Sequence, residues 1–228
     1  MHALTVLYGG SLSSQAFEPL SGEKSAFSLA LERCSAFPGS EKTILLTGEG
    51  DLPGCPEGLT LIRRPYWTVK ELLEVLSKES AAYDFAYYAW ADTPFLDPSL
   101  AGRIAQRHTR FAADYSYADG WPYGLGPELI IPQAAGILSK IAGETGLGPV
   151  TRDTLFGVLQ KDINSFDIET EISAVDLRCH RLSLAADSKR NLLLLRRFIE
   201  AGCDGAESAG EIIEKHPEYL RTLPGKRG

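Results

Sequence analysis

Residues 85–98 read FAYYAWADTPFLDP, and this stretch decides the fold. Its apolar, aromatic part, residues 85–91, ends abruptly in Asp-Thr-Pro, a pattern typical of a buried parallel strand bounded by a turn. Asp92 is therefore expected at or just past the carboxyl end of a strand, the edge where open α/β sheets bind ligands. A carboxylate there can hold a hard metal ion that bridges phosphate oxygens. It can equally form an Asx turn before a proline, and this segment alone leaves both interpretations open.

Apolar strands alternate with amphipathic helices on both sides of this stretch. This alternation predicts an α/β fold with a mostly parallel central sheet, right-handed crossovers and helices on both faces. Beyond residue 110 the pattern changes, and a small antiparallel insertion is expected at 113–131. The expected strands are 3–8, 42–47, 59–63, 85–91, 113–117, 128–131, 166–170 and 181–184, and the expected helices are 25–36, 68–79, 100–108, 132–142, 151–160, 189–201 and 209–216.

The length of 228 residues suits one large α/β domain with a small appendage. We expect a first domain at 1–202, followed at 203–228 by a short helix and a tail. That tail ends in Gly-Lys-Arg-Gly at 225–228, a composition typical of a linker. On this interpretation the chain is the leading domain of a longer polypeptide.

Composition excludes several classes of partner. The formal net charge of −7 argues against a nonspecific nucleic-acid binder, which needs a basic face. No apolar run approaches the length of a membrane span, so no membrane partner is expected. The four cysteines, none in a CxxC pair or at zinc spacing, indicate free thiols in a reducing, cytoplasmic compartment.

Two further segments carry candidate ligand contacts. The first expected strand runs into Gly9-Gly10-Ser11, where backbone N–H groups can approach a phosphate or a base, although the same residues can form a simple tight turn. The turn around Trp121 and Tyr123 presents two aromatic rings that can stack on a base or a sugar. Asp153, before an expected helix, is interpreted as a first-turn acid that the helix dipole favours.

Four motifs then follow in a fixed order: PLSGEK at 19–24, ADTPFLDP at 91–98, YGLGPEL at 123–129 and RLSLAAD at 181–187. This series resembles the cytidylyltransferase superfamily, which includes the acylneuraminate and Kdo cytidylyltransferases and the spore-coat polysaccharide proteins. The resemblance spans about residues 3–200. It implies the nucleotide-diphospho-sugar transferase fold and a function in nucleotide-sugar chemistry, for example in cell-surface polysaccharide biosynthesis.

The resemblance also implies roles for particular residues. Asp92 and Asp187 would hold a catalytic Mg²⁺. A nucleoside triphosphate or a nucleotide-sugar would be the ligand. The nucleotide side would comprise Gly9, Gly10, Ser11 and Lys24, and the acceptor side Trp121, Tyr123, Gly124 and Glu128.

The chain departs from the family pattern at positions that carry charge. The loop at 10–18 contains no cation, whereas the family's loop carries an Arg and a Lys that stabilise charge during transfer. Gly126 replaces an acceptor-side Asp, and Ala185 stands where the second metal-binding Asp falls, with Asp187 two residues on. The nearest substitutes for the missing cations are Lys24, Lys42, Arg63 and Arg64.

Two hypotheses follow. The first is a magnesium-dependent nucleotidyltransferase. The second is a catalytically degenerate binding or interaction domain, similar to the N-terminal parts of larger spirochaetal radical-SAM proteins. Its partners would be further domains of the same polypeptide or a second copy in a homodimer.

Overall fold

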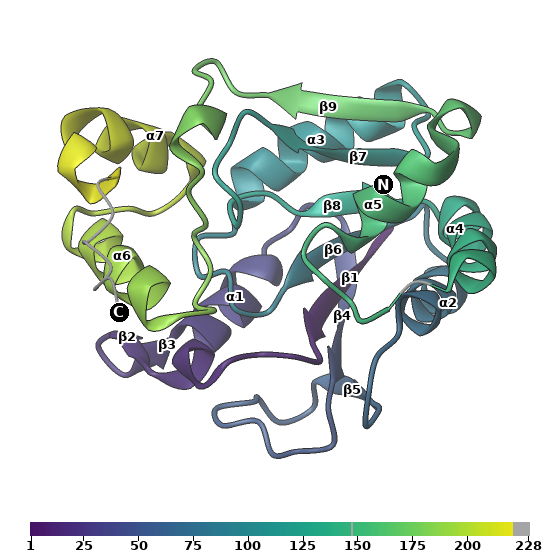
Figure 1. Ribbon diagram of the computed structural model, residues 1–228, viewed down its shortest axis with the longest axis horizontal. Coiled ribbons are helices and arrows are strands. Elements are labelled where there is room, and N and C mark those ends of the chain that lie inside the picture. Colours follow the sequence, from purple (N-terminus) through teal and green to yellow (C-terminus); the bar gives the residue numbers. More distant parts are fainter. Residues whose placement is uncertain (147, 221–228) are drawn as a thin grey trace.

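The computed structural model describes residues 1–146 and 148–220; the linker-like end predicted at 225–228 lies outside them. A seven-stranded sheet forms the centre of the molecule (Figure 1). Its spatial order is β5 (Thr60–Arg63), β4 (Ser40–Thr47), β1 (Ala3–Gly9), β6 (Phe85–Trp90), β8 (Glu128–Ile130), β7 (Tyr115–Asp119) and β9 (Ile168–Ile172). The α/β class with a mostly parallel sheet is confirmed.

The antiparallel part of the fold is built into the main sheet. β8 runs antiparallel to both of its neighbours, β6 and β7, while β9 is parallel to β7. The strands expected at 113–117 and 128–131 therefore extend the central sheet. A separate two-stranded hairpin, β2 (Pro19–Ser21) with β3 (Lys24–Ser25), precedes the first helix.

The strand expected at 181–184 does not form. In its place Ser183 makes one isolated parallel bridge to Tyr123. Arg181 has a φ of 48°, in the left-handed region that ends the short 3₁₀ turn Arg178–His180. An extended strand cannot continue through such a residue, so only the segment after it pairs.

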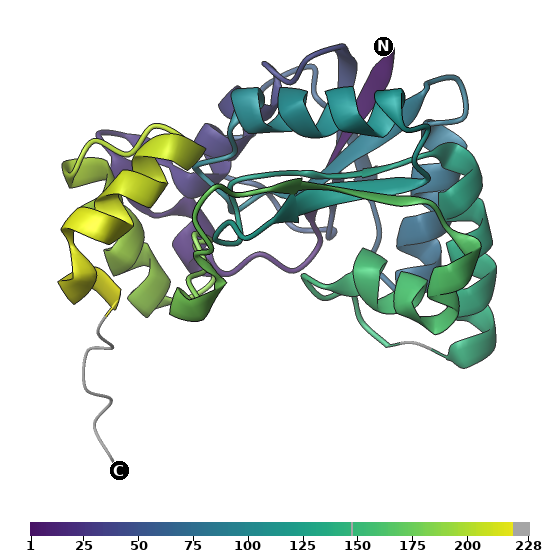
Figure 2. The same ribbon diagram turned by 90° about the horizontal axis from the view of Figure 1, so that it is seen from above.

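Helices cover both faces of the sheet (Figure 2). The side chains of β6 alternate between the two cores, so that Tyr87 packs with one set of helices and Tyr88 with the other. The first set is α1 (Ala26–Cys34), α3 (Pro98–Arg110), α6 (Lys189–Glu200) and α7 (Ala206–Lys215). The second is α2 (Val69–Glu79), α4 (Pro132–Thr145) and α5 (Thr154–Leu159).

Asp97 ties the C-terminal helix to the body. Its Oδ1 accepts the Ser99 N–H at 2.7 Å and caps α3, while its Oδ2 accepts the Ala206 N–H at 2.7 Å at the start of α7. Ile212 and Ile213 of α7 are buried in the same core as α1 and α3. None of the helices that the structure describes is both long and apolar enough to cross a membrane.

Candidate functional site

Asp92 lies just past the carboxyl end of β6, at the sheet edge predicted from the sequence. The Ala91 N–H donates to the Tyr8 carbonyl at 2.9 Å, which places this turn beside the glycine loop after β1. The Asp92 carbonyl accepts the Ala186 N–H at 2.9 Å, which brings the segment around residue 187 to the same edge. The glycine loop and two of the four motifs, 91–98 and 181–187, thus meet at Asp92, whose side chain is 1% exposed.

Arg152 occupies the position opposite the Asp92 carboxylate. Its Nη1 and Nη2 donate to Asp92 Oδ1 at 3.1 Å and Oδ2 at 2.5 Å, a bidentate pair. The guanidinium also lies over the Trp90 ring, with its Cζ 4.4 Å from the ring centroid, and Nη1 donates to Tyr123 Oη at 3.2 Å. The side chain is 20% exposed, so this cation is largely removed from water.

The same guanidinium reaches the second predicted metal ligand. Arg152 Nη2 lies 3.5 Å from Asp187 Oδ2, and the Asp187 Oδ1 accepts the Asn191 side-chain N–H of α6 at 2.8 Å. The two carboxylates that the resemblance assigns to a metal ion therefore flank one arginine.

Local structure before α5 explains how Arg152 is presented. Pro149 bridges to Thr68 at the start of α2, and Val150 is buried in the core between these helices. The Thr151 N–H then donates to Thr154 Oγ1 at 2.7 Å, which fixes the turn from which Arg152 projects. Arg152 therefore projects from the turn before α5, on the opposite side of the sheet from α1, the helix that follows the glycine loop.

The donor set does not fit Mg²⁺ as it stands. Mg²⁺ requires near-octahedral oxygen ligands, and both Asp92 oxygens already accept guanidinium N–H groups. Within residues 1–146 and 148–220 no cluster of three or more His, Cys, Asp or Glu side chains could hold a metal ion. Arg152 would have to leave before Asp92 could bind one.

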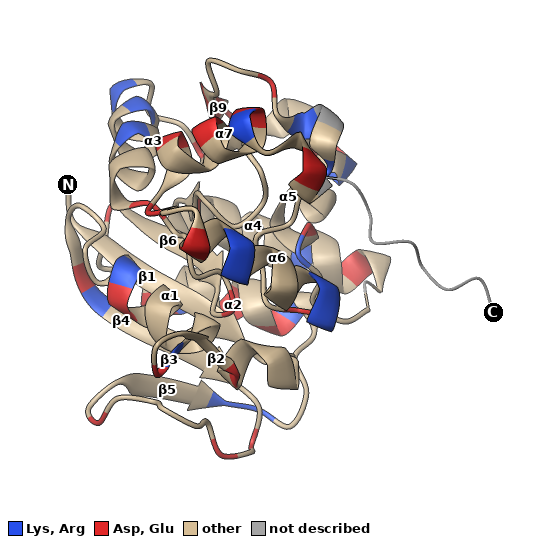
Figure 3. Ribbon diagram, turned by 90° about the vertical axis from the view of Figure 1, so that its left-hand side faces the viewer, with Lys and Arg blue, Asp and Glu red and all other residues tan. Residues whose placement is uncertain are grey.

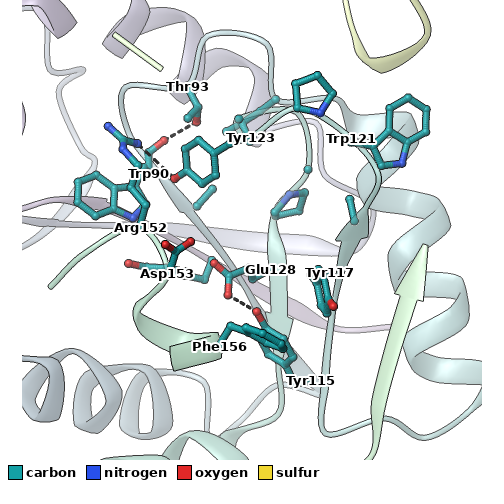
Figure 4. Close-up of a pocket in the computed structure, with 18 residues that line it drawn as sticks. Trp90, Thr93, Tyr115, Tyr117, Trp121, Tyr123, Glu128, Arg152, Asp153 and Phe156 are labelled. Carbon is teal, nitrogen blue, oxygen red and sulfur yellow. Dashed lines mark hydrogen bonds between the residues drawn. The ribbon is translucent and has the colours of Figure 1, made fainter. Parts of the chain in front are cut away.

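A cavity of about 230 Å³ opens beside this site. All four residues predicted for the acceptor side line it, namely Trp121, Tyr123, Gly124 and Glu128. Several aromatic side chains line it, Tyr88 among them, and Figure 4 shows Trp90, Tyr115, Tyr117 and Phe156. The described lining includes none of the residues predicted for the nucleotide side.

Two carboxylates lie in the middle of this cavity. Figure 4 shows Glu128 and Asp153 between the Arg152–Trp90 end and the Tyr115–Phe156 end. Tyr115 Oη donates to Glu128 Oε2. Burial is the main cause that raises the pKa of Glu128 to about 7; the Tyr115 hydrogen bond opposes this rise, and the Asp153 carboxylate adds to it.

Three polar atoms of the cavity wall have no hydrogen-bond partner in the described structure. They are the Tyr88 hydroxyl and the indole Nε1 atoms of Trp90 and Trp121, all buried. A buried donor without a partner costs free energy, so a ligand or water with acceptor oxygens satisfies it. The cavity thus offers donors on its aromatic walls and acceptors on Glu128 and Asp153.

At two positions near the site, close packing explains why the residue is glycine. Gly124 has a φ of 98°, and a Cβ there would lie 2.7 Å from the Leu184 carbonyl oxygen. A Cβ on Gly10 would lie 2.6 Å from the Trp67 ring and 2.8 Å from the Tyr8 hydroxyl. Both backbone positions therefore require glycine before any ligand contact is considered.

Three of the four cations proposed to replace those of the loop bind other groups of the protein. Lys24, in the β2–β3 hairpin, pairs with Glu32 at 2.6 Å. Arg63 donates to the carbonyl of Gly50 at 2.8 Å, and Arg64 pairs with Glu71 at 2.8 Å. Ser11 is exposed at the loop tip, and Lys42 is exposed on β4.

Sequence reasoning missed Arg152 as part of this site and interpreted Asp153 only as a first-turn acid favoured by the helix dipole. The structure places Asp153 in the cavity, and its side chain makes no cap hydrogen bond. Arg152 lies sixty positions from Asp92 along the chain. One cation before a short helix gives no signal of that contact.

Comparisons with known proteins agree with the geometry of the fold. No protein-family model matches the chain. Two uncharacterized proteins of Treponema pallidum (strain Nichols) match short segments, at 37% identity over 70 residues and 35% over 51 residues. These segments cover 31% and 22% of this chain and only 19% and 23% of those relatives, so the matches span about a fifth of their length.

Several solved structures are similar to this chain over most of its length. A cytidylyltransferase from Leptospira borgpetersenii superposes with a TM-score of 0.75 at 15% identity, covering 99% of this chain and 98% of that one. A CMP-2-keto-3-deoxy-manno-octonic acid synthetase in complex with CTP gives 0.62 at 13% identity, over 88% and 99%. The 2-C-methyl-D-erythritol 4-phosphate cytidylyltransferase of Thermus thermophilus gives 0.60 at 12% identity, over 88% and 100%. The chain therefore has the nucleotidyltransferase-like fold that these cytidylyltransferases share.

Proposed function

We propose that this chain is a binding domain with a cytidylyltransferase fold, which recognises a sugar-like ligand without a metal ion. The observation that carries the proposal is the bidentate pairing of Arg152 with Asp92, together with its contact to Asp187. A fixed guanidinium supplies positive charge where a metal-dependent transferase needs a divalent ion. It has no open coordination position for a phosphate oxygen or a water molecule.

The cavity supports a neutral or amino-bearing polyhydroxylated ligand. Its aromatic walls offer flat apolar faces, and its unpaired indole and phenol groups can donate to hydroxyl oxygens. Its charged groups are Glu128, Asp153 and Arg152, and the last is already paired with two carboxylates. An acidic sugar would meet the Asp153 carboxylate, a partly ionised Glu128 and no free cation there, so electrostatics disfavours it.

The cation-free loop at 10–18 fits the same interpretation. Its Leu12 and Phe17 pack against the core of α1, and the Ser13 hydroxyl donates to the Ala186 carbonyl at 2.8 Å. The loop is thus closed onto the segment before Asp187, with no charged group to neutralise a triphosphate. In this proposal the sugar could belong to a nucleotide-sugar, and the domain would serve cell-surface polysaccharide biosynthesis as part of a longer polypeptide.

One observation favours the enzyme as a second candidate. Because Asp92 and Asp187 both contact the same Nη2 atom, at 2.5 and 3.5 Å, an ion that displaced Arg152 would be within reach of both. Arg152 could then turn toward the phosphates and replace the cations missing from the loop. This candidate requires magnesium-dependent release of pyrophosphate from a nucleoside triphosphate.

Calorimetry with a ligand panel separates the two candidates. We expect neutral hexoses or amino sugars, free or in nucleotide-sugars, to bind in the presence of EDTA and to lose affinity in Trp121→Ala. Lys215→Ala, a change on the exposed face of α7 outside the cavity, is the control and should bind as the wild type does. Pyrophosphate release that requires Mg²⁺ and disappears in Asp92→Asn would overturn the proposal in favour of the enzyme.

A further inference from the structure

A second cavity, of about 170 Å³, lies between residues 181–183 and α6. Three arginines line it, Arg181 from the turn and Arg190 and Arg197 from α6, the last two on one face of the helix about two turns apart. Figure 3 shows the basic positions of α6 in blue on the side of the molecule that carries this helix. The lining contains no acidic residue among those that the structure describes.

These arginines differ from most others in the chain. Nowhere in residues 1–146 and 148–220 does a carboxylate lie within ion-pair distance of Arg181, Arg190 or Arg197. The neighbouring Arg196, by contrast, pairs with Glu18 at 3.6 Å and donates to the Pro19 carbonyl at 3.1 Å. In a protein of net charge −7, three uncompensated guanidiniums around one cavity form a local positive site.

A hydroxyl group in the same cavity also lacks a partner. Ser183 Oγ is buried and makes no hydrogen bond in the described structure. The remaining walls are Leu182, Leu193, Leu194, Asn191 and Tyr219, and the Asn191 amide N–H already donates to Asp187. The cavity therefore combines three charged donors, one unused hydroxyl donor and a partly apolar wall.

We propose that this cavity binds the phosphate group of a small phosphorylated ligand. Guanidinium groups match the geometry of phosphate oxygens and form short charge-assisted hydrogen bonds with them. A phosphate dianion presents enough oxygens and charge for three arginines and a hydroxyl together, whereas a single carboxylate has only two oxygens. Free phosphate and the phosphoryl group of a sugar phosphate share this chemistry.

The phosphate site is separate from the aromatic cavity but shares a wall with it. The Tyr123 N–H donates to the Leu182 carbonyl at 3.3 Å, and the Tyr123 carbonyl accepts the Leu184 N–H at 2.8 Å. Tyr123 lines the aromatic cavity, while Leu182 and Ser183 line the second one. The inference does not depend on the proposed sugar-binding function, because none of the three arginines lines the aromatic cavity.

Titration with inorganic phosphate and with glucose 1-phosphate tests this site by calorimetry. Arg190→Gln and Arg197→Gln should each weaken binding about tenfold or more, the scale of a lost charge-assisted hydrogen bond, and Ser183→Ala should weaken it about threefold. Arg196→Gln removes the same charge from the same helix outside the cavity, and should change affinity less than about twofold. Stronger binding of the sugar phosphate than of phosphate would identify the phosphorylated sugar as the ligand class.

Two results would overturn the inference. One is the absence of phosphate binding by the wild-type chain at millimolar concentration and low ionic strength. The other is equal weakening by Arg196→Gln and Arg190→Gln, which would mean that the general field of the helix, and no defined site, attracts the anion. Melting temperatures of the variants confirm that each protein compared is folded.

Discussion

Arg152→Met tests whether the guanidinium is needed to keep Asp92 in its buried position. Methionine keeps most of the side-chain volume and can still pack on the Trp90 ring, but it removes both hydrogen bonds to the carboxylate. Asp92 is 1% exposed, so the substitution leaves a carboxylate with little access to water. The folded state should lose stability for that reason more than for any change in packing.

The magnitude follows from the geometry of the pair. Two unit charges about 4 Å apart interact by about 4 kcal/mol at an effective dielectric constant near 20. Removing one partner of a buried pair typically costs about 3–5 kcal/mol, because the other charge stays uncompensated. We expect Arg152→Met to lower the free energy of unfolding by that amount.

Urea denaturation of the proteins of a double-mutant cycle measures this loss in the free energy of unfolding. Asp92→Asn/Arg152→Met should recover about half of the loss, because no unpaired charge is left behind. The matched control is Arg107→Met, which breaks a pair with Glu169 at 2.8 Å whose side chains are much more exposed, 43% and 25%, and should cost less than about 1 kcal/mol. A cost for Arg152→Met as small as that of Arg107→Met would refute the reasoning.

Three further predictions concern stability. Burial raises the pKa of Glu128 from 4.5 to about 7, so the folded state holds this proton more tightly than the unfolded state and loses stability as pH rises through that range. Glu128→Gln should therefore stabilise the protein near pH 8 by up to about 3 kcal/mol, and much less near pH 4, as measured in thermal melts. Burial lowers the pKa of His108 from 6.5 to about 4, so stability falls as pH drops between these values, and His108→Gln should flatten that part of the profile. Gly124→Ala should cost about 1–3 kcal/mol in urea denaturation, because its Cβ would lie 2.7 Å from the Leu184 carbonyl oxygen; an unchanged midpoint would contradict this geometry.

Local signals in the sequence predicted the parallel half of the fold well. The run at 85–91 became β6, and the helix expected from Thr68 to Glu79 formed as α2, where Thr68 and Glu71 make a capping box. These features depend on residues close together in the chain. The position of Asp92 at the sheet edge followed from the same local pattern, and the structure has it there.

Contacts between residues far apart in the chain could not be predicted from the sequence. The insertion of β8 between β6 and β7 depends on strand pairing across more than forty residues, for which a three-residue apolar segment gives no register. The contact of Arg152 with Asp92 likewise arises from the packing of α4 and α5 against the sheet. Glu128 was predicted from a motif, but its neighbours Tyr115 and Asp153 could only be found in three dimensions.

The most direct test of metal-independent binding is the electron paramagnetic resonance signal of free Mn²⁺, which falls when the ion binds a protein. In the absence of nucleotide, which itself chelates Mn²⁺, the wild-type chain should bind no more Mn²⁺ than the Asp92→Asn variant does, because Arg152 holds both Asp92 oxygens. Arg152→Ala should free these oxygens and bind Mn²⁺ measurably more tightly. Binding of Mn²⁺ by the wild type that Asp92→Asn abolishes would contradict the account.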